Sequence, residues 1–181
     1  MKVWPVPDSF SRVIPMDNAQ GSFWENRQDR NHAGVDIYAP SGSVVLATED
    51  GFILETCIFT SPDVIRYWNI TYSILLKTPD NRILRFAEMG DITVKQGQKV
   101  VAGDLLGHVG IVLNTDKIDE TSPGYIQKLK VANLPAMLHF EMYSSLPIEV
   151  QNYLGGNFFK GQRPVSLINP TEYLKSILQD S

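Results

Sequence analysis

Residues 43–59 read SVVLATEDGFILETCIF, two apolar and β-branched runs separated by Asp50-Gly51. Val, Ile, Thr and Phe favour strands, and an Asp-Gly pair between two such runs is a strong hairpin signal. The stretch therefore predicts two strands joined by a tight turn. Cys57, the only cysteine, lies in the second run, and we interpret it as a buried structural thiol.

The same pattern of strands and turns continues along the chain. Strand-forming runs at 68–77 and 82–89 are separated by Pro79-Asp80-Asn81, whose residues favour turns. Residues 94–107 contain short apolar runs punctuated by glycines, where the chain can turn tightly. Successive hairpins without a long helical period predict an all-β, mainly antiparallel fold with a sandwich or barrel-like sheet.

Two later segments depart from this pattern. Residues 113–136 are polar, and we expect a long loop that holds one short helix near 125–131. Asn169-Pro170 begins the clearest helical pattern, with Glu172 placed for a capping box and an apolar stripe along one face. This short C-terminal helix is expected to close the core.

Length and composition limit the class of protein. A chain of 181 residues suffices for one domain, which we predict over 31–181 after an extended arm over 1–30. The net charge of −4 excludes the basic surface with which nucleic-acid-binding proteins neutralise phosphates. Neither a signal-peptide pattern nor an apolar run of membrane-spanning length is present, so the sequence as written predicts a cytoplasmic protein or export without a recognisable leader.

His32 and Asp36 lie four residues apart in the segment NHAGVDIYAP. In a straight strand such residues would be about 13 Å apart, too far to share a metal ion. A bend at Gly34 would bring the imidazole and the carboxylate together. A pair of this kind on its own is more often structural than metal-binding.

His139 lies in AMLHFEMY at 136–143, where strand alternation places it on one face with Met137 and Glu141. The opposite face is apolar and is expected to be buried. One interpretation of His139 is a structural histidine satisfied by Glu141 or by a backbone carbonyl. The third histidine, His108, has no acidic residue or histidine near it in the sequence, so we expect a structural role.

Taken in order, these segments resemble the lysostaphin/LytM-type zinc endopeptidases, family twenty-three of the metallopeptidases. The resemblance covers about residues 30 to 175 and is carried by HAGVD at 32–36, APSG at 39–42, the glycine pattern at 94–107, LHFE at 138–141 and NPT at 169–171. It implies an antiparallel β-sandwich with the duplicated hybrid motif and the cleavage of peptide bonds in bacterial peptidoglycan. It also implies that His32, Asp36 and His139 bind Zn²⁺.

The sequence departs from this family at two positions. Met137 replaces the first histidine of the usual His-x-His pair, and Phe86-Ala87-Glu88 replaces the usual Tyr-x-His. Both usual catalytic histidines are therefore missing. We interpret Glu88 as a catalytic general base, with a surface glutamate as the alternative. Glu141 is expected to support a metal-bound histidine through its other nitrogen rather than to bind the metal.

Three functions are compatible with these features. The first is a zinc metallopeptidase that hydrolyses peptidoglycan or another peptide with a metal-activated water. The second is a non-catalytic module of the same fold that binds peptidoglycan or regulates another hydrolase. The third, a phosphotransferase carrier domain phosphorylated on His32, is disfavoured by LHFE at 138–141 and by Asn169-Pro170.

Overall fold

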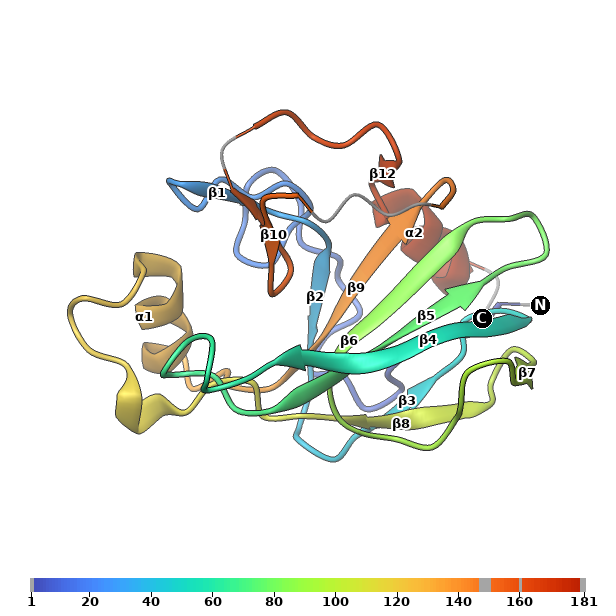
Figure 1. Ribbon diagram of the computed structural model, residues 1–181, viewed down its shortest axis with the longest axis horizontal. Coiled ribbons are helices and arrows are strands. Elements are labelled where there is room, and N and C mark those ends of the chain that lie inside the picture. Colours follow the sequence, from blue (N-terminus) through green and yellow to red (C-terminus); the bar gives the residue numbers. More distant parts are fainter. Residues whose placement is uncertain (1, 147–150, 160, 180–181) are drawn as a thin grey trace.

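The structure is a computed structural model that describes residues 2–146, 151–159 and 161–179. Figure 1 shows strands grouped into twisted sheets, with one helix near each end of the main sheet. The elements are β1 (Arg30–His32), β2 (Val35–Tyr38), β3 (Val44–Leu46), β4 (Gly51–Thr60), β5 (Thr71–Lys77), β6 (Ile83–Ile92), β7 (Lys99–Val100), β8 (Leu105–Val109), the 3₁₀ turn η1 (Thr115–Lys117), α1 (Gly124–Val131), β9 (Met137–Tyr143), β10 (Tyr153–Leu154), β11 (Asn157–Phe159), β12 (Leu167–Ile168) and α2 (Thr171–Gln179).

All strand pairs of the described residues are antiparallel. The larger sheet has the order β12-β9-β6-β5-β4-β7, with β2 added to β9, β8 added to β6 and β3 added to β8. The smaller sheet, β1-β11-β10, lies above β2 and β9 in the view of Figure 1. The predicted all-β, mainly antiparallel fold with a short C-terminal helix is confirmed, and its described strands do not close into a barrel.

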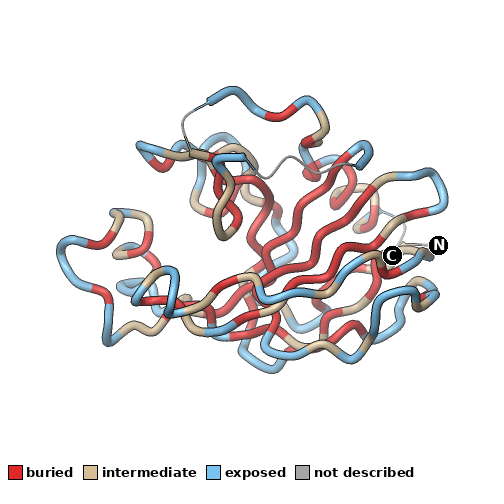
Figure 2. The backbone as a smooth tube through the Cα atoms, in the orientation of Figure 1, coloured by how far each residue is buried: buried red, intermediate tan, exposed pale blue. Residues whose placement is uncertain are grey.

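Both faces of the central strands are covered, as the red strands of Figure 2 show. On one face Leu84, Leu138 and Phe140 are fully buried and pack with Leu174 and other apolar residues of α2. On the other face a second apolar cluster includes residues of β5, β6, β9 and β11. Every residue of β9 is buried, because one face meets the main apolar core and the other meets apolar clusters and buried polar side chains.

The C-terminal helix begins as the sequence predicts. The Asn169 side chain accepts a hydrogen bond from the backbone N–H of Thr171 at 2.9 Å, which satisfies one free donor of the first turn. The Glu172 carboxylate accepts a hydrogen bond from Lys175 instead of closing a capping box. The short helix expected near 125–131 is also present, as α1.

The hairpin predicted at Pro79-Asp80-Asn81 is confirmed, because β5 and β6 pair directly. The hairpin predicted at Asp50-Gly51 is wrong, because β3 pairs with β8 and β4 pairs with β5 and β7. Asp50 accepts a hydrogen bond from the backbone N–H of Ala102, so it connects to the turn after β7. The pairing of β3 with a distant strand leaves Val45 fully buried. This long-range pairing outweighs the local turn preference.

The interpretation of Cys57 as a buried thiol is also wrong. Cys57 is exposed on β4, whose outer edge is paired with β7 only over Gly51 and Phe52. Its Sγ lies 3.3 Å from Ser73 Oγ on the neighbouring strand. Partial burial raises the pKa of this thiol above its usual value, so the thiol stays protonated at neutral pH.

Side chains from the first thirty residues contribute to the main core. Trp4, Val6 and Ile14 are buried in it, and the Val3 N–H donates a hydrogen bond to the Thr48 carbonyl. The domain boundary between 1–30 and 31–181 stays a prediction. No helix in the described ranges has the length and apolar character required to cross a membrane.

The chain bends at Gly34, between β1 and β2, as the spacing of His32 and Asp36 requires. A Cβ atom added at Gly34 would lie 2.3 Å from the backbone oxygen of Phe140, so only glycine allows β2 to approach β9 this closely. We expect Gly34→Ala to lower the free energy of unfolding by about 1–3 kcal/mol, measured by urea denaturation. Gly124→Ala is the matched control, because nothing lies within 4 Å of the added methyl, and equal losses in both variants would contradict this account.

Candidate metal centre

Three of the predicted site residues meet at one point. β2 pairs with β9 so that Asp36 lies opposite His139, and the bend at Gly34 turns His32 towards both. Asp36 Oδ1 lies 3.0 Å from His32 Nε2 and 2.9 Å from His139 Nδ1, and the two imidazole nitrogens are 2.9 Å apart. The three residues are at most 4% exposed. They form the one group of metal-ligating side chains found in the described part of the chain.

The outer nitrogen of each imidazole has a partner that fixes its proton. His32 Nδ1 donates to the Ser22 carbonyl at 2.8 Å, because a carbonyl can only accept, and this leaves a lone pair on Nε2. His139 Nε2 lies 2.8 Å from Glu141 Oε1 and donates to that carboxylate, which leaves a lone pair on Nδ1. Two imidazole lone pairs and a carboxylate oxygen thus converge, which is the donor set that suits zinc.

When no metal cation is bound, a proton on an imidazole can partly balance the negative charge of the nearby carboxylates. Burial disfavours a charged imidazole, but hydrogen bonds to Asp36 and Glu141 raise the pKa of His139 to about 10. Burial and the positive charge of Arg27 lower the pKa of His32, so His32 stays neutral. A metal ion would therefore compete with one proton, at His139.

Glu141 lies at the centre of a buried network behind His139. Its carboxylate accepts hydrogen bonds from Arg85 at 2.9 Å, Tyr143 at 2.6 Å and Tyr153 at 2.5 Å, besides the one from His139. Burial opposes its ionisation, but Arg85 and His139 lower the pKa of Glu141 to about 2. It touches the imidazole nitrogen that points away from Asp36, which is the position required for a supporting residue.

Glu88 lies where β6 changes partners. The ladder to β9 ends at Ala87, opposite His139, and the ladder to β8 begins at Met89. Glu88 itself has φ +64°, a left-handed conformation that is rare outside glycine and typical of functional sites. The residue is 9% exposed, so it is not a surface glutamate.

The Glu88 side chain is short of partners. Its Oε2 has no hydrogen-bond partner among the residues that the structure describes. Burial and the negative charge of Asp36 raise the pKa of Glu88 to about 8. It lines the same cavity as all three candidate ligands and Met137. A buried carboxyl group with a raised pKa thus lies next to the candidate metal centre.

Residues 30–148 match the family model named Peptidase family M23, which covers more than half of the chain. The chain belongs to peptidase family M23. No curated protein sequence matches it.

Solved structures of M23 peptidases share this fold. A protein described as the glycyl-glycine endopeptidase LytM from Ruminococcus gnavus aligns with a TM-score of 0.57 at 20% identity, over 98% of this chain and 61% of the other. The antimicrobial peptidase lysostaphin from Staphylococcus simulans aligns with a TM-score of 0.55 at 18% identity, over 98% of this chain and 56% of the other. The catalytic domain of lysostaphin gives a TM-score of 0.47 at 19% identity, over 80% of each chain. The chain thus spans less than two thirds of the length of the first two proteins.

The cavity of this M23-family chain is small. It measures about 20 Å³, which is room for one water molecule and too little for a peptide. Tyr125, Ile126 and Leu129 of α1 cover it, and they pack in an apolar cluster with Trp68 and Met137. Met137 therefore packs against the residues of α1 that line the site.

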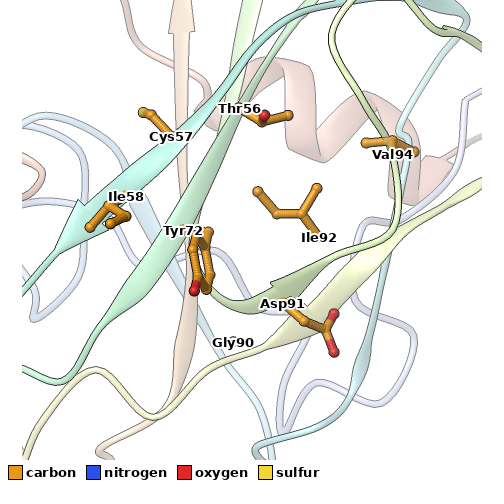
Figure 3. A pocket seen from close by; sticks show the side chains of 8 residues that line it. All are labelled: Thr56, Cys57, Ile58, Tyr72, Gly90, Asp91, Ile92 and Val94. Atoms are coloured by element: carbon orange, nitrogen blue, oxygen red, sulfur yellow. The ribbon is translucent and has the colours of Figure 1, made fainter.

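A larger hollow of about 590 Å³ lies elsewhere in this M23-family chain, beside β4, β5 and the end of β6. Figure 3 shows its lining, which includes Tyr72, Asp91 and Ile92 and none of the predicted site residues. The third histidine, His108, lies near it and contacts the Asp91 carboxylate at 2.9 Å. The metal-ligating side chains converge in the small cavity and do not line this hollow.

The sequence did not indicate several residues of this M23 site. Ser22 contributes only a backbone carbonyl, which no side-chain pattern can reveal. Arg27 and Tyr125 line the cavity from segments predicted to be an arm and a loop. Arg85 could have been found from strand alternation, because it shares a face of β6 with Ala87, which lies opposite His139.

Proposed function

We propose that this M23-family chain is a zinc peptidase that hydrolyses a peptide bond of peptidoglycan or a related peptide, with His32, Asp36 and His139 as zinc ligands. Membership of the peptidase family supports hydrolysis of peptides in general. The observation that carries the zinc proposal is the convergence of two imidazole lone pairs and one carboxylate oxygen within 3.0 Å of one another.

Three protein ligands with a position left for water are the arrangement of a catalytic zinc site. When bound, zinc would lower the pKa of a water molecule and polarise the scissile carbonyl. The cavity beside the ligands has room for that water.

We assign the proton-accepting role to Glu88. Its unpartnered Oε2 and its place in the cavity support this role. Met137 can neither accept nor donate a proton usefully, so the work usually shared by two histidines would fall on one carboxylate. We expect slow turnover for this reason.

We assign Glu141 to the orientation of His139. Glu141→Gln should weaken zinc binding by about 10- to 100-fold, because a neutral amide holds the imidazole N–H less strongly. Competition with a chromophoric zinc chelator measures this affinity. Glu172→Gln is the control, because Glu172 is an exposed residue of α2. An unchanged affinity in Glu141→Gln would remove the assigned role.

A non-catalytic module is the second candidate function. It is favoured by the small volume of the cavity and by the replacement of both usual catalytic histidines. Such a module would keep the metal and bind peptidoglycan without cleaving it.

The deciding experiment incubates the zinc-loaded protein with purified peptidoglycan and with short peptides containing glycine or D-alanine. Mass spectrometry of the soluble fraction then detects released fragments. We expect slow release that stops when zinc is removed by a chelator and resumes when zinc is restored. Binding to peptidoglycan without any released fragment would support the non-catalytic module instead.

A further inference from the structure

Arg27 is a buried cation placed directly beside the candidate metal centre. Its guanidinium Nη2 lies 3.3 Å from Asp36 Oδ2 and 2.9 Å from Glu25 Oε2, and Nη1 donates to Asn157 Oδ1 at 3.1 Å. The guanidinium also stacks on the ring of Tyr125, at 4.3 Å. The Arg27 side chain is 6% exposed. Hydrogen-bond partners around the planar guanidinium and an aromatic ring on its face therefore hold it in one orientation.

The backbone around Arg27 holds it in this position. The Arg27 N–H donates to the Arg30 carbonyl, and the His32 N–H donates to the Glu25 carbonyl, so a tight turn leads from Arg27 into β1. The Asp36 N–H donates to the Gly21 carbonyl. Residues 21–27 therefore lie against Asp36. They precede residues 30–148, the part of the chain that matches the family model.

The two oxygens of Asp36 have separate partners. Oδ1 faces both imidazoles, and Oδ2 faces the guanidinium of Arg27. A carboxylate can bind a metal ion through one oxygen or through both. An Asp36 held in this way offers one oxygen only.

We propose that Arg27 is a positioning residue that keeps Asp36 a one-oxygen metal ligand and so preserves the ligand position that water needs. This inference rests on the zinc site proposed above. Without Arg27, Oδ2 would be free to turn towards the metal and take that position. Arg27 also places a positive charge near the metal ion, and this charge would repel the ion. A residue whose role was to increase metal affinity would not carry such a charge.

The test uses the full chain loaded with cobalt(II), whose visible absorption reports coordination number. Four-coordinate cobalt absorbs more strongly than five-coordinate cobalt, so geometry can be read from band intensity. We expect wild type to give the intense spectrum, and Arg27→Met to lose much of that intensity. Arg27→Lys should show the same change, because a compact ammonium group lacks the rigid planar fork with which the guanidinium reaches Glu25, Asp36 and Asn157 at once.

Metal affinity and hydrolysis should change in different directions. We expect Arg27→Met to bind cobalt as tightly as wild type or more tightly, because a repelling cation is lost. Its kcat/KM on a cleaved peptide should fall by about 10- to 100-fold. Should Arg27→Met lose the folded circular-dichroism spectrum, the spectrum of cobalt-loaded Arg27→Lys decides.

Two results would overturn this proposal. One is a cobalt spectrum that is identical in wild type and in both folded variants. The other is weaker cobalt binding with an unchanged spectrum, which is the behaviour of a residue that only supports the fold. A wild-type protein that binds neither cobalt nor zinc would instead overturn the proposed metal site itself.

Discussion

Replacing Glu88 by glutamine should lower kcat/KM for a cleaved wall peptide by about 10²- to 10⁴-fold, the usual contribution of one general base. The reason is that Glu88 is the one carboxyl group in the cavity with an unpartnered oxygen among the described residues. Glutamine has nearly the same shape, so zinc content should stay at the wild-type level. Rates come from mass spectrometry of fragments at matched zinc loading.

Glu120→Gln is the control for this substitution, because Glu120 is exposed and does not line the cavity. It should leave the rate unchanged. Full activity in Glu88→Gln would remove the role of Glu88 as a base. A loss of activity accompanied by loss of zinc would assign Glu88 to metal binding instead.

The raised pKa of Glu88 has a consequence for stability without metal. Its pKa is about 8 in the folded protein and near 4.5 when unfolded, so the folded state binds the extra proton between these values. Metal-free wild type should lose stability as pH rises through this window, whereas Glu88→Gln should not. The difference in free energy of unfolding between wild type and Glu88→Gln should change by on the order of 3–5 kcal/mol between about pH 4 and about pH 9. Urea denaturation of both proteins at both pH values measures this change. An equal change of stability with pH in the two proteins would contradict the buried position of Glu88.

Replacing His32 by alanine should abolish zinc-dependent stabilisation. A ligand that binds only the folded state adds about 4 kcal/mol to the free energy of unfolding at 1,000 times its Kd. Wild type should show this gain in thermal melts with added zinc, and His32→Ala should show none. His32 is suited to the test because it is neutral, so its removal takes no counter-charge away from the buried Asp36 carboxylate.

His108→Ala is the matched histidine control. Its side chain is one-third exposed and contacts Asp91, outside the candidate centre. This variant should melt with the same zinc-dependent gain as wild type. An equal gain in His32→Ala would show that zinc binds elsewhere.

The sequence predicted the features that depend on local pattern. Alternation along 136–143 placed His139 and Glu141 on one face, and Gly34 marked the bend that brings His32 to Asp36. The hairpin between β5 and β6 and the start of α2 at Asn169 followed from turn and capping preferences. These outcomes depend on residues that are close in the chain.

The features that could not be predicted depend on contacts between distant segments. The Asp50-Gly51 hairpin failed because β3 and β4 each found a better partner far along the chain. Cys57 lies in an apolar run, yet the open edge of β4 leaves it exposed. Arg27 approaches Asp36 through a turn that no periodic pattern announces.

The zinc content of the purified protein tests the central claim most directly. The protein is prepared without chelators, equilibrated with zinc, freed of loosely bound metal by gel filtration, and analysed by elemental analysis beside His139→Ala. We predict one zinc per chain in wild type and a loss of nearly all zinc in His139→Ala. No zinc in folded wild type, or equal zinc in both proteins, would contradict a metal centre formed by His32, Asp36 and His139.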